Sequence, residues 1–223
     1  MAHRRFGAFY ARSFERRPWL TLAIANGTLG ALADTLAQTL EKYNGKPAKQ
    51  IPSKEDVTQK LEGTQSQWDF ARTSRFFAFG VGMAPLLAEW NKWIEHRFPL
   101  RSSVGAVAGK VSLTALGKRV AVDQIAFAPF GLVCFVGAMG FMEGRSVQGV
   151  GQKFDEMYMS ALLANWQVWP LVQTINFRFM PLRYRVPFTG AIGIAWQVFL
   201  SILNASRNKV GTVEQGKIGR YLR

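Results

Sequence analysis

Four long apolar runs, separated by polar and basic segments, dominate the chain. They cover residues 19–40, 73–94, 120–142 and 186–203. As helices they would be roughly 27 to 35 Å long, close to the hydrocarbon thickness of a bilayer. A soluble helical bundle with unusually apolar central helices is the alternative. The basic residues that flank these runs favour the membrane, because cationic side chains sit well among lipid head groups.

A fifth apolar stretch, residues 157–185, contains the sequence ANWQVWPLVQTINFRFMPLRYR at 164–185. Its interior Pro170 lacks a backbone N–H and predicts a kink or a break. Tryptophan and tyrosine residues near the ends of the runs are typical of anchoring at the membrane interface. The pattern therefore predicts an all-α fold, a polytopic membrane helix bundle. It would have four transmembrane helices plus one proline-kinked amphipathic or interfacial segment.

All 223 residues are predicted to form a single membrane domain, residues 1–223. This domain would include a basic N-terminal segment, a polar connector between the first two helices, and a basic C-terminal tail. Those three parts are residues 1–18, 41–72 and 207–223. The connector has the Gly, Pro and charged composition of a flexible linker.

A net charge of +14 and a pI of about 10.4 indicate a polyanionic partner. The basic residues lie between the apolar runs rather than on one face, which favours membrane lipids, including anionic ones, over nucleic acid. One cysteine, Cys134, excludes a disulfide within the chain, and two histidines argue against a metal site. We find no catalytic motif and no cofactor-binding motif, so we expect neither an enzyme nor a bound cofactor.

Three of the runs contain an acidic residue: Asp34, Glu89 and Asp123. A carboxylate at the centre of a membrane costs a few kcal/mol and is tolerated where it faces protein or water. Residues three or four positions apart share a helix face, and three such stripes of small and polar residues occur. The stripes are Gly27, Gly30, Asp34 and Gln38; Arg75, Gly82, Pro85 and Glu89; and Gly190, Gly193, Gln197, Ser201 and Asn204.

Two interpretations of these stripes remain open. Small residues can let helices approach closely while polar residues form hydrogen bonds between them. Alternatively, the stripes can line a hydrated path through the protein. Asp34 and Glu89 favour the second interpretation, because charges are a costly way to join helices.

The first 17 residues hold five arginines and one acid, Glu15. This composition resembles a mitochondrial targeting segment, and it equally fits the positive flank of the first span. Both interpretations stay open.

Residues from the fifth stretch onward carry a specific family signature. The matching positions are Trp166, Trp169, Pro170, Gln173, Asn176, Phe177, Pro181, Arg185, Trp196, Leu200 and Ser201. With upstream landmarks such as Asp34, Arg75 and Asp123, they resemble the Mpv-seventeen and twenty-two-kilodalton peroxisomal membrane protein family. The chain departs from the signature at Gln197 and Phe199, where Asn and Tyr are expected.

The resemblance implies an integral protein of the mitochondrial inner membrane or of the peroxisomal membrane. It implies a weakly selective channel for small solutes, linked to mitochondrial metabolite homeostasis and mitochondrial DNA maintenance. We expect the basic start to favour the mitochondrion. We also expect Pro170 and Pro181 to bound a hairpin-like segment held at the interface by Trp166 and Trp169.

The candidate pore or bundle-interior residues are Asp34, Gln38, Arg75, Glu89, Asp123, Gln124, Gln173, Asn176, Arg185 and Gln197. Five glycines are expected at helix contacts: Gly27, Gly30, Gly82, Gly190 and Gly193. Gln173 and Asn176 are further expected to satisfy backbone groups freed by the kink. A rival hypothesis is a non-conducting structural or assembly subunit, either a homo-oligomer or part of a larger complex. The polar connector and the basic tail, both suited to protein contacts, motivate it.

Overall fold

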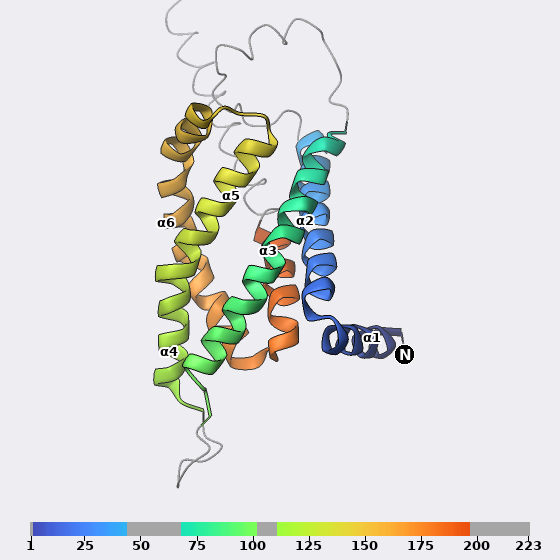
Figure 1. The fold of residues 1–223 in the computed structure, drawn as a ribbon, viewed down its shortest axis with the longest axis vertical. Helices are drawn as coiled ribbons and strands as arrows, with labels where there is room; N and C mark the ends of the chain where they lie inside the picture. The colour runs from blue at the N-terminus through green and yellow to red at the C-terminus, as the bar shows by residue number, and fades with distance from the viewer. Residues whose placement is uncertain (1, 44–67, 102–110, 197–223) are drawn as a thin grey trace, which may run out of the picture.

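The computed structural model describes residues 2–43, 68–101 and 111–196, with side chains described from residue 7 onward. Every regular element in these ranges is a helix, so the predicted all-α class is confirmed (Figure 1). The elements are α1 (Ala2–Arg16), α2 (Pro18–Tyr43), α3 (Phe70–Arg97), α4 (Leu113–Val122), the π-helix η2 (Asp123–Phe127), α5 (Ala128–Met142) and α6 (Val147–Phe179). Residues 182–196 form a further helix, called here the 182–196 helix.

Helices α2 and α3 form a closely packed antiparallel pair (Figure 1). Gly80 makes this contact possible, because a Cβ atom there would lie 2.6 Å from the backbone oxygen of Asn26. The Asn26 amide also donates to the Gly80 carbonyl at 2.8 Å. Gly27 and Gly30 on α2 lie against Phe77, Val81 and the backbone of Phe76. Small residues therefore let the two backbones approach, as is usual for helices packed in a membrane.

The segment Leu113–Met142 is one continuous rod made of α4, η2 and α5 (Figure 1). Within it, the amide of Ala128 donates to the carbonyl of Asp123, five residues back, which defines the wide π turn. Pro129 follows directly and has no N–H to continue that ladder. Gly144, with φ of 78°, turns the chain into α6, which Ser146 caps at Gly149 N. Helix α6 then packs along the rod.

A charged contact beyond the end of the rod supports the turn between α5 and α6. The Glu143 carboxylate accepts from Lys153 at 2.8 Å and from Arg145 at 2.9 Å. Burial alone would raise the pKa of Glu143, but the hydrogen bonds from Lys153 and Arg145 outweigh it and hold the pKa below its ordinary value. The carboxylate therefore stays ionised and holds α6 to the turn.

Helix α1 projects sideways from the lower end of α2 in the view of Figure 1, and contacts with the residues after α6 dock it to the bundle. The Tyr10 hydroxyl donates to the Arg183 carbonyl at 2.9 Å, and its ring stacks on Tyr184 with centroids 5.6 Å apart. Burial, together with the neighbouring Tyr184, raises the pKa of Tyr10 to about 12, so the donor stays neutral and protonated. Glu15 pairs with the Arg183 guanidinium at 3.2 Å. The basic N-terminal segment is thus packed against the bundle.

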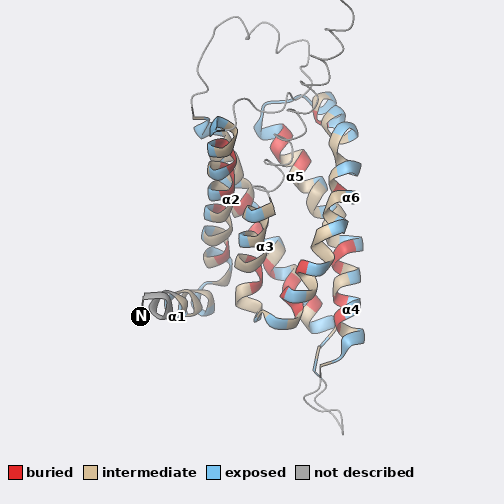
Figure 2. Ribbon diagram, turned by 180° about the vertical axis from the view of Figure 1, so that it is seen from behind, coloured by how far each residue is buried: buried red, intermediate tan, exposed pale blue. Residues whose placement is uncertain are grey.

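The surface of the molecule is unusually apolar, and its interior contains charges. Exposed large apolar side chains lie on several helices, among them Ile24, Leu86, Ile125 and Leu171 (Figure 2). Buried polar side chains are Asp34, Gln38, Asn91, Arg119, Asp123, Gln124, Asn176 and Arg185. Apolar side chains on the outside and polar groups between helices are expected of helices with lipid outside.

Two described helices, Pro18–Tyr43 and Leu113–Met142, are long and apolar enough to cross a membrane. Helices α3 and α6 are also long enough to cross a bilayer, but their polar residues make them less apolar than a typical membrane span. The predicted run 186–203 extends beyond the described residues. The structure therefore supports two of the four predicted spans by length and composition.

The expectation of a separate, proline-bounded hairpin is wrong. Helix α6 continues through Pro170 to Phe179, and the Thr174 hydroxyl donates to the Pro170 carbonyl at 2.7 Å. Pro181 lies at the junction between α6 and the 182–196 helix. A proline in a long, laterally packed helix loses one backbone hydrogen bond, and the neighbouring helices keep the rest in place. Trp166 is exposed, while Trp169 is half-buried.

Of the five glycines predicted at contacts, Gly82 does not lie at one among the described residues. Gly190 packs against Leu29, but Gly82 and Gly193 have no described atom within 4 Å of an added Cβ. Gly82 is exposed, because α3 turns Gly80, Met83 and Ala84 toward its neighbours instead. Gly80, two residues earlier, makes the close contact.

The pair Gly80 and Gly82 provides a matched test of this packing. We expect Gly80→Ala to destabilise the protein by ~1–3 kcal/mol, because the new methyl meets backbone atoms that cannot move aside. Gly82→Ala adds the same group on the exposed face, where the gain in helix propensity makes it neutral or stabilising. Thermal unfolding of both variants in the same detergent measures the difference. Equal midpoints would contradict the close packing of α2 and α3.

Candidate functional site

A polar cluster joins the C-terminal half of α2 to the start of α3. We call it the Asp34 cluster, and it comprises Asp34, Gln38, Asp69, Arg72 and Thr73. The Asp34 carboxylate lies 2.6 Å from Arg72 Nε and accepts from the Thr73 hydroxyl at 2.7 Å. The Gln38 amide donates to the same carboxylate at 2.7 Å. Asp34 is buried, and both of its oxygens have partners across or along the helix pair.

Gln38 connects this cluster to the beginning of α3. Its side-chain oxygen accepts from the Asp69 amide at 2.9 Å, and its amide nitrogen lies 3.0 Å from the Asp69 carbonyl. Asp69 in turn caps α3 by accepting from Arg72 N at 2.7 Å. Arg72 also forms a two-pronged ion pair with Glu41. The start of α3 is therefore fixed by the same residues that neutralise Asp34.

A second cluster surrounds Asp123 in the π turn. The carboxylate accepts from Trp90 Nε1 at 2.9 Å, from Gln124 Nε2 at 2.9 Å and from Gln173 Nε2 at 2.8 Å. The Asn176 amide then donates to Gln173 at 2.9 Å. We call Trp90, Asp123, Gln124, Gln173 and Asn176 the Asp123 cluster. It joins α3, the rod and α6, and it shows that Gln173 and Asn176 do not bond backbone freed by Pro170.

The local sequence explains why Trp166 faces this cluster. In a π turn the Gln124 carbonyl would bond the amide five residues later, but that residue is Pro129, which has no N–H. The Trp166 indole donates to the Gln124 carbonyl instead, at 2.9 Å. The ring that was expected to anchor the chain at the interface therefore also completes the backbone hydrogen bonding of the rod.

A third cluster lies where α3 ends and α4 begins, and comprises Glu95, Arg119 and Arg185. Arg185 Nη1 lies 2.8 Å from Glu95 Oε2. Arg119 Nε donates to the Phe98 carbonyl at 2.7 Å. Both arginines are almost completely buried. Glu95 and Arg119 were missed from the sequence because they lie at the edges of apolar runs. The spacing of Arg119 four residues before Asp123 on one helix was the signal that could have found it.

Several predicted site residues lie elsewhere. Glu89 is exposed, where it pairs with Lys92 at 2.9 Å and accepts from Trp19 Nε1 at 2.8 Å, so its assignment to the bundle interior is wrong. It shares the outward face of α3 with Gly82. Arg75 is half-buried, and its Nη2 lies 3.7 Å from Asp69 Oδ2. Gln197 lies outside the described residues.

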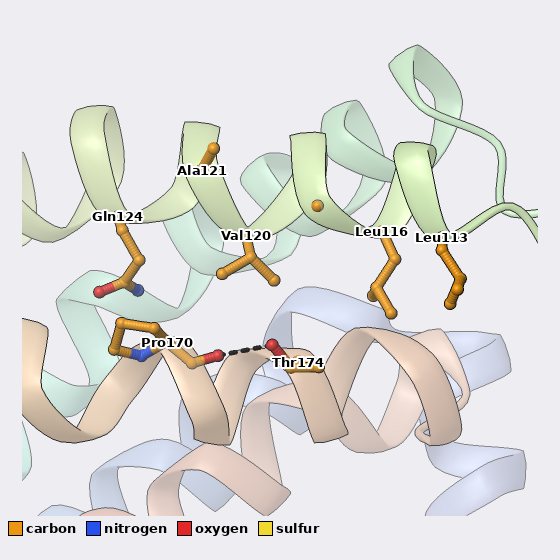
Figure 3. A pocket seen from close by; sticks show the side chains of 8 residues that line it. Leu113, Leu116, Val120, Ala121, Gln124, Pro170 and Thr174 are labelled. Atoms are coloured by element: carbon orange, nitrogen blue, oxygen red, sulfur yellow. Dashed lines mark hydrogen bonds between the residues drawn. The ribbon is translucent and has the colours of Figure 1, made fainter.

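An open groove separates α4 from α6 beside the Asp123 cluster (Figure 3). Its volume is about 440 Å³, and apolar side chains such as Leu116, Val120 and Pro170 form most of its wall. Gln124 and Thr174 supply its polar edge. Within the described residues, no group of three or more His, Cys, Asp or Glu side chains is placed to hold a metal ion.

These features define a class of protein: an integral membrane helix bundle with polar clusters between its helices. A model of the Mpv17 / PMP22 family matches residues 140–201. Protein sym1 of Schizosaccharomyces pombe is 33% identical over 207 residues, covering 91% of this chain and 92% of that protein. Protein SYM1 of Saccharomyces cerevisiae is 32% identical over 197 residues, covering 88% of each. The chain belongs to the Mpv17 / PMP22 family, which confirms the resemblance. No solved structure matches it.

The contrast between Asp34 and Glu89 can be tested directly. Asp34→Asn replaces an acceptor oxygen with a donor that faces Arg72, Thr73 and Gln38, so we expect a loss of ~2–4 kcal/mol in stability. Glu89→Gln changes an exposed pair and should cost well under 1 kcal/mol. Denaturation in detergent at one pH compares the two. A larger loss for Glu89→Gln would contradict the burial described here.

Proposed function

We propose that this membrane protein is a weakly selective channel for small solutes that serves mitochondrial metabolite homeostasis and, through it, mitochondrial DNA maintenance. Its immediate partners would be membrane lipids, including anionic ones. The proposal involves no catalytic step and no cofactor.

One observation carries the proposal: buried polar atoms in the bundle whose hydrogen bonding the protein leaves incomplete. Gln124 Oε1, Asn176 Oδ1 and Arg119 Nη1 have no hydrogen-bond partner in the described part of the chain. A buried polar atom without a partner costs ~1–3 kcal/mol. Water can remove that cost where the site is polar and roomy. A hydrated path through a bundle surrounded by lipid first requires water molecules bound between the helices, and these polar atoms could bind them.

The arrangement along α3 supports a gated path. The Asp34 cluster includes Thr73 and the Asp123 cluster includes Trp90, and these two residues lie about 26 Å apart along α3 at 1.5 Å per residue. Between them α3 presents mainly Gly80, Met83 and Ala84 to its neighbours. A path with polar residues at both ends and apolar residues between them resembles a hydrophobic constriction, which opens when water enters it and closes when water leaves.

Reconstitution in planar bilayers tests the channel. We expect a measurable conductance that falls severalfold in Asn176→Leu and Gln124→Leu, because each change removes polar surface and adds an apolar side chain beside the path. Glu89→Gln, on the exposed face, is the matched control and should conduct like the unaltered protein. Absence of any conductance from the unaltered protein would refute the proposal.

The rival, a non-conducting structural or assembly subunit, is favoured by a different observation. The two interior carboxylates each have several partners within the protein: Asp34 pairs with Arg72 and accepts from Thr73 and Gln38, and Asp123 accepts from three donors. Carboxylates with this many partners are suited to joining helices, because few of their acceptor sites remain free to bind a passing solute. Migration far above the monomer on native gels, without conductance in the bilayer experiment, would support this rival.

We place the channel in the mitochondrial inner membrane, with the peroxisomal membrane as the alternative. The exposed arginines Arg12, Arg16 and Arg17 on and after α1 support this location. Replacing all three by Gln keeps the docking residues Tyr10 and Glu15. We expect fluorescence imaging to show mitochondrial staining for the unaltered chain and its loss in the triple variant. Peroxisomal staining of the unaltered chain would contradict the assignment.

A further inference from the structure

At the lower end of the bundle in Figure 1, the described residues contain more buried positive charge than they neutralise. Arg119 is 2% exposed and Arg185 is 4% exposed. Among the described residues, the one carboxylate facing them is Glu95, in the last turn of α3. Two guanidinium groups and one carboxylate leave an excess of one positive charge. A buried charge without compensation is strongly unfavourable in a protein interior.

Arg119 has no carboxylate of its own. Its Nε donates to the Phe98 carbonyl at 2.7 Å, and its Nη2 lies 3.5 Å from the Glu95 carbonyl. These bonds satisfy carbonyl groups at the end of α3, where a positive charge is favourable. They do not cancel the charge, and Arg119 Nη1 has no hydrogen-bond partner in the described chain. Donor capacity therefore remains at a nearly inaccessible guanidinium.

Arg185 and Glu95 do not remove this excess. The Arg185 guanidinium lies over the Phe177 ring at 5.5 Å and pairs with Glu95 at 2.8 Å. The Glu95 side chain is 45% exposed, so water already screens part of its charge. Arg119 interacts electrostatically with both groups, repelled by Arg185 and attracted by Glu95. The single carboxylate is thus shared by two cations.

Asp123 is not paired with either arginine, and the groups that act electrostatically on Arg119 are Arg185 and Glu95. Asp123 lies four residues after Arg119 on the same rod, but its oxygens already accept from Trp90, Gln124 and Gln173. The 182–196 helix also begins here, and the positive end of its dipole adds to the field near Arg185. The unpartnered Arg119 Nη1 and the N-terminus of the 182–196 helix therefore favour a negative group beside the two arginines.

We propose that Arg119 and Arg185 form a binding site for a single oxyanion, a phosphate or carboxylate group, at this end of the bundle. Planar guanidinium groups match such oxygens in charge and geometry. The oxyanion can come from the head group of an anionic lipid or from a dissolved solute. The site goes beyond the proposed channel and does not depend on conduction.

The test uses the full chain purified in a detergent without phosphate groups. Inorganic phosphate is titrated in one arm, and mixed micelles containing phosphatidic acid or phosphatidylcholine are titrated in the other. Tryptophan fluorescence and the thermal midpoint report binding. We expect the affinity for the bound probe to fall about tenfold in Arg119→Gln, because charge-assisted hydrogen bonds are lost. Arg97→Gln removes an exposed arginine from the same end and is the matched control.

A second variant keeps the proposal testable if Arg119→Gln does not fold. Glu95→Gln removes the competing carboxylate, so we expect the oxyanion to bind several times more tightly. Binding of inorganic phosphate identifies a solute site, and binding of phosphatidic acid alone identifies a lipid site; either supports the proposal. No binding of either probe, equal losses in Arg119→Gln and Arg97→Gln, or unchanged affinity in Glu95→Gln would overturn it. Because conductance is not measured, the proposed channel stands or falls separately.

Discussion

Hydrogen-bonded pairing of buried charges between helices is the interaction on which the rest of this structure depends. Lipid on the outside removes the hydrophobic force that would press the helices together in water. Close contact at Gly80 and the ties from Asp34 to Arg72 and from Asp123 to Gln173 take its place. Each tie joins residues far apart in the chain. Breaking one leaves a charge uncompensated, which makes the arrangement of helices specific.

The two ends of the bundle differ in how completely their charges are paired. At the Asp34 cluster the carboxylate pairs with Arg72 and accepts from Thr73, and Asp69 also caps α3. At the opposite end Arg119 and Arg185 share Glu95, and polar atoms remain without partners. The Asp34 end therefore mainly joins α2 to α3, whereas the end with Arg119 and Arg185 has unused capacity to bind water or an anion. A channel and an anion site both draw on the second end.

Much of the polar interior was visible in the sequence, because a polar residue inside an apolar run must face away from lipid. Asp34, Gln38, Asp123 and Asn176 were named on that basis, and all four are buried. The same reasoning failed for Glu89, which is exposed. A stripe at helical spacing shows that residues share a face, but it does not show which face turns inward. Arg119 and Glu95 were overlooked because charges at the edges of apolar runs were assigned to lipid head groups.

The sequence by itself determined that the chain is helical, apolar enough for a membrane and a relative of one family, because length, composition and spacing are local properties. Only the tertiary structure decided that Gly80 rather than Gly82 is the contact, that Pro170 lies inside one long helix, and that Trp166 completes the turn before Pro129. Those outcomes depend on which atoms of distant segments meet. Hydrogen bonds and ion pairs between helices select one rotation of each helix about its own axis. The sequence pattern alone does not distinguish between these rotations.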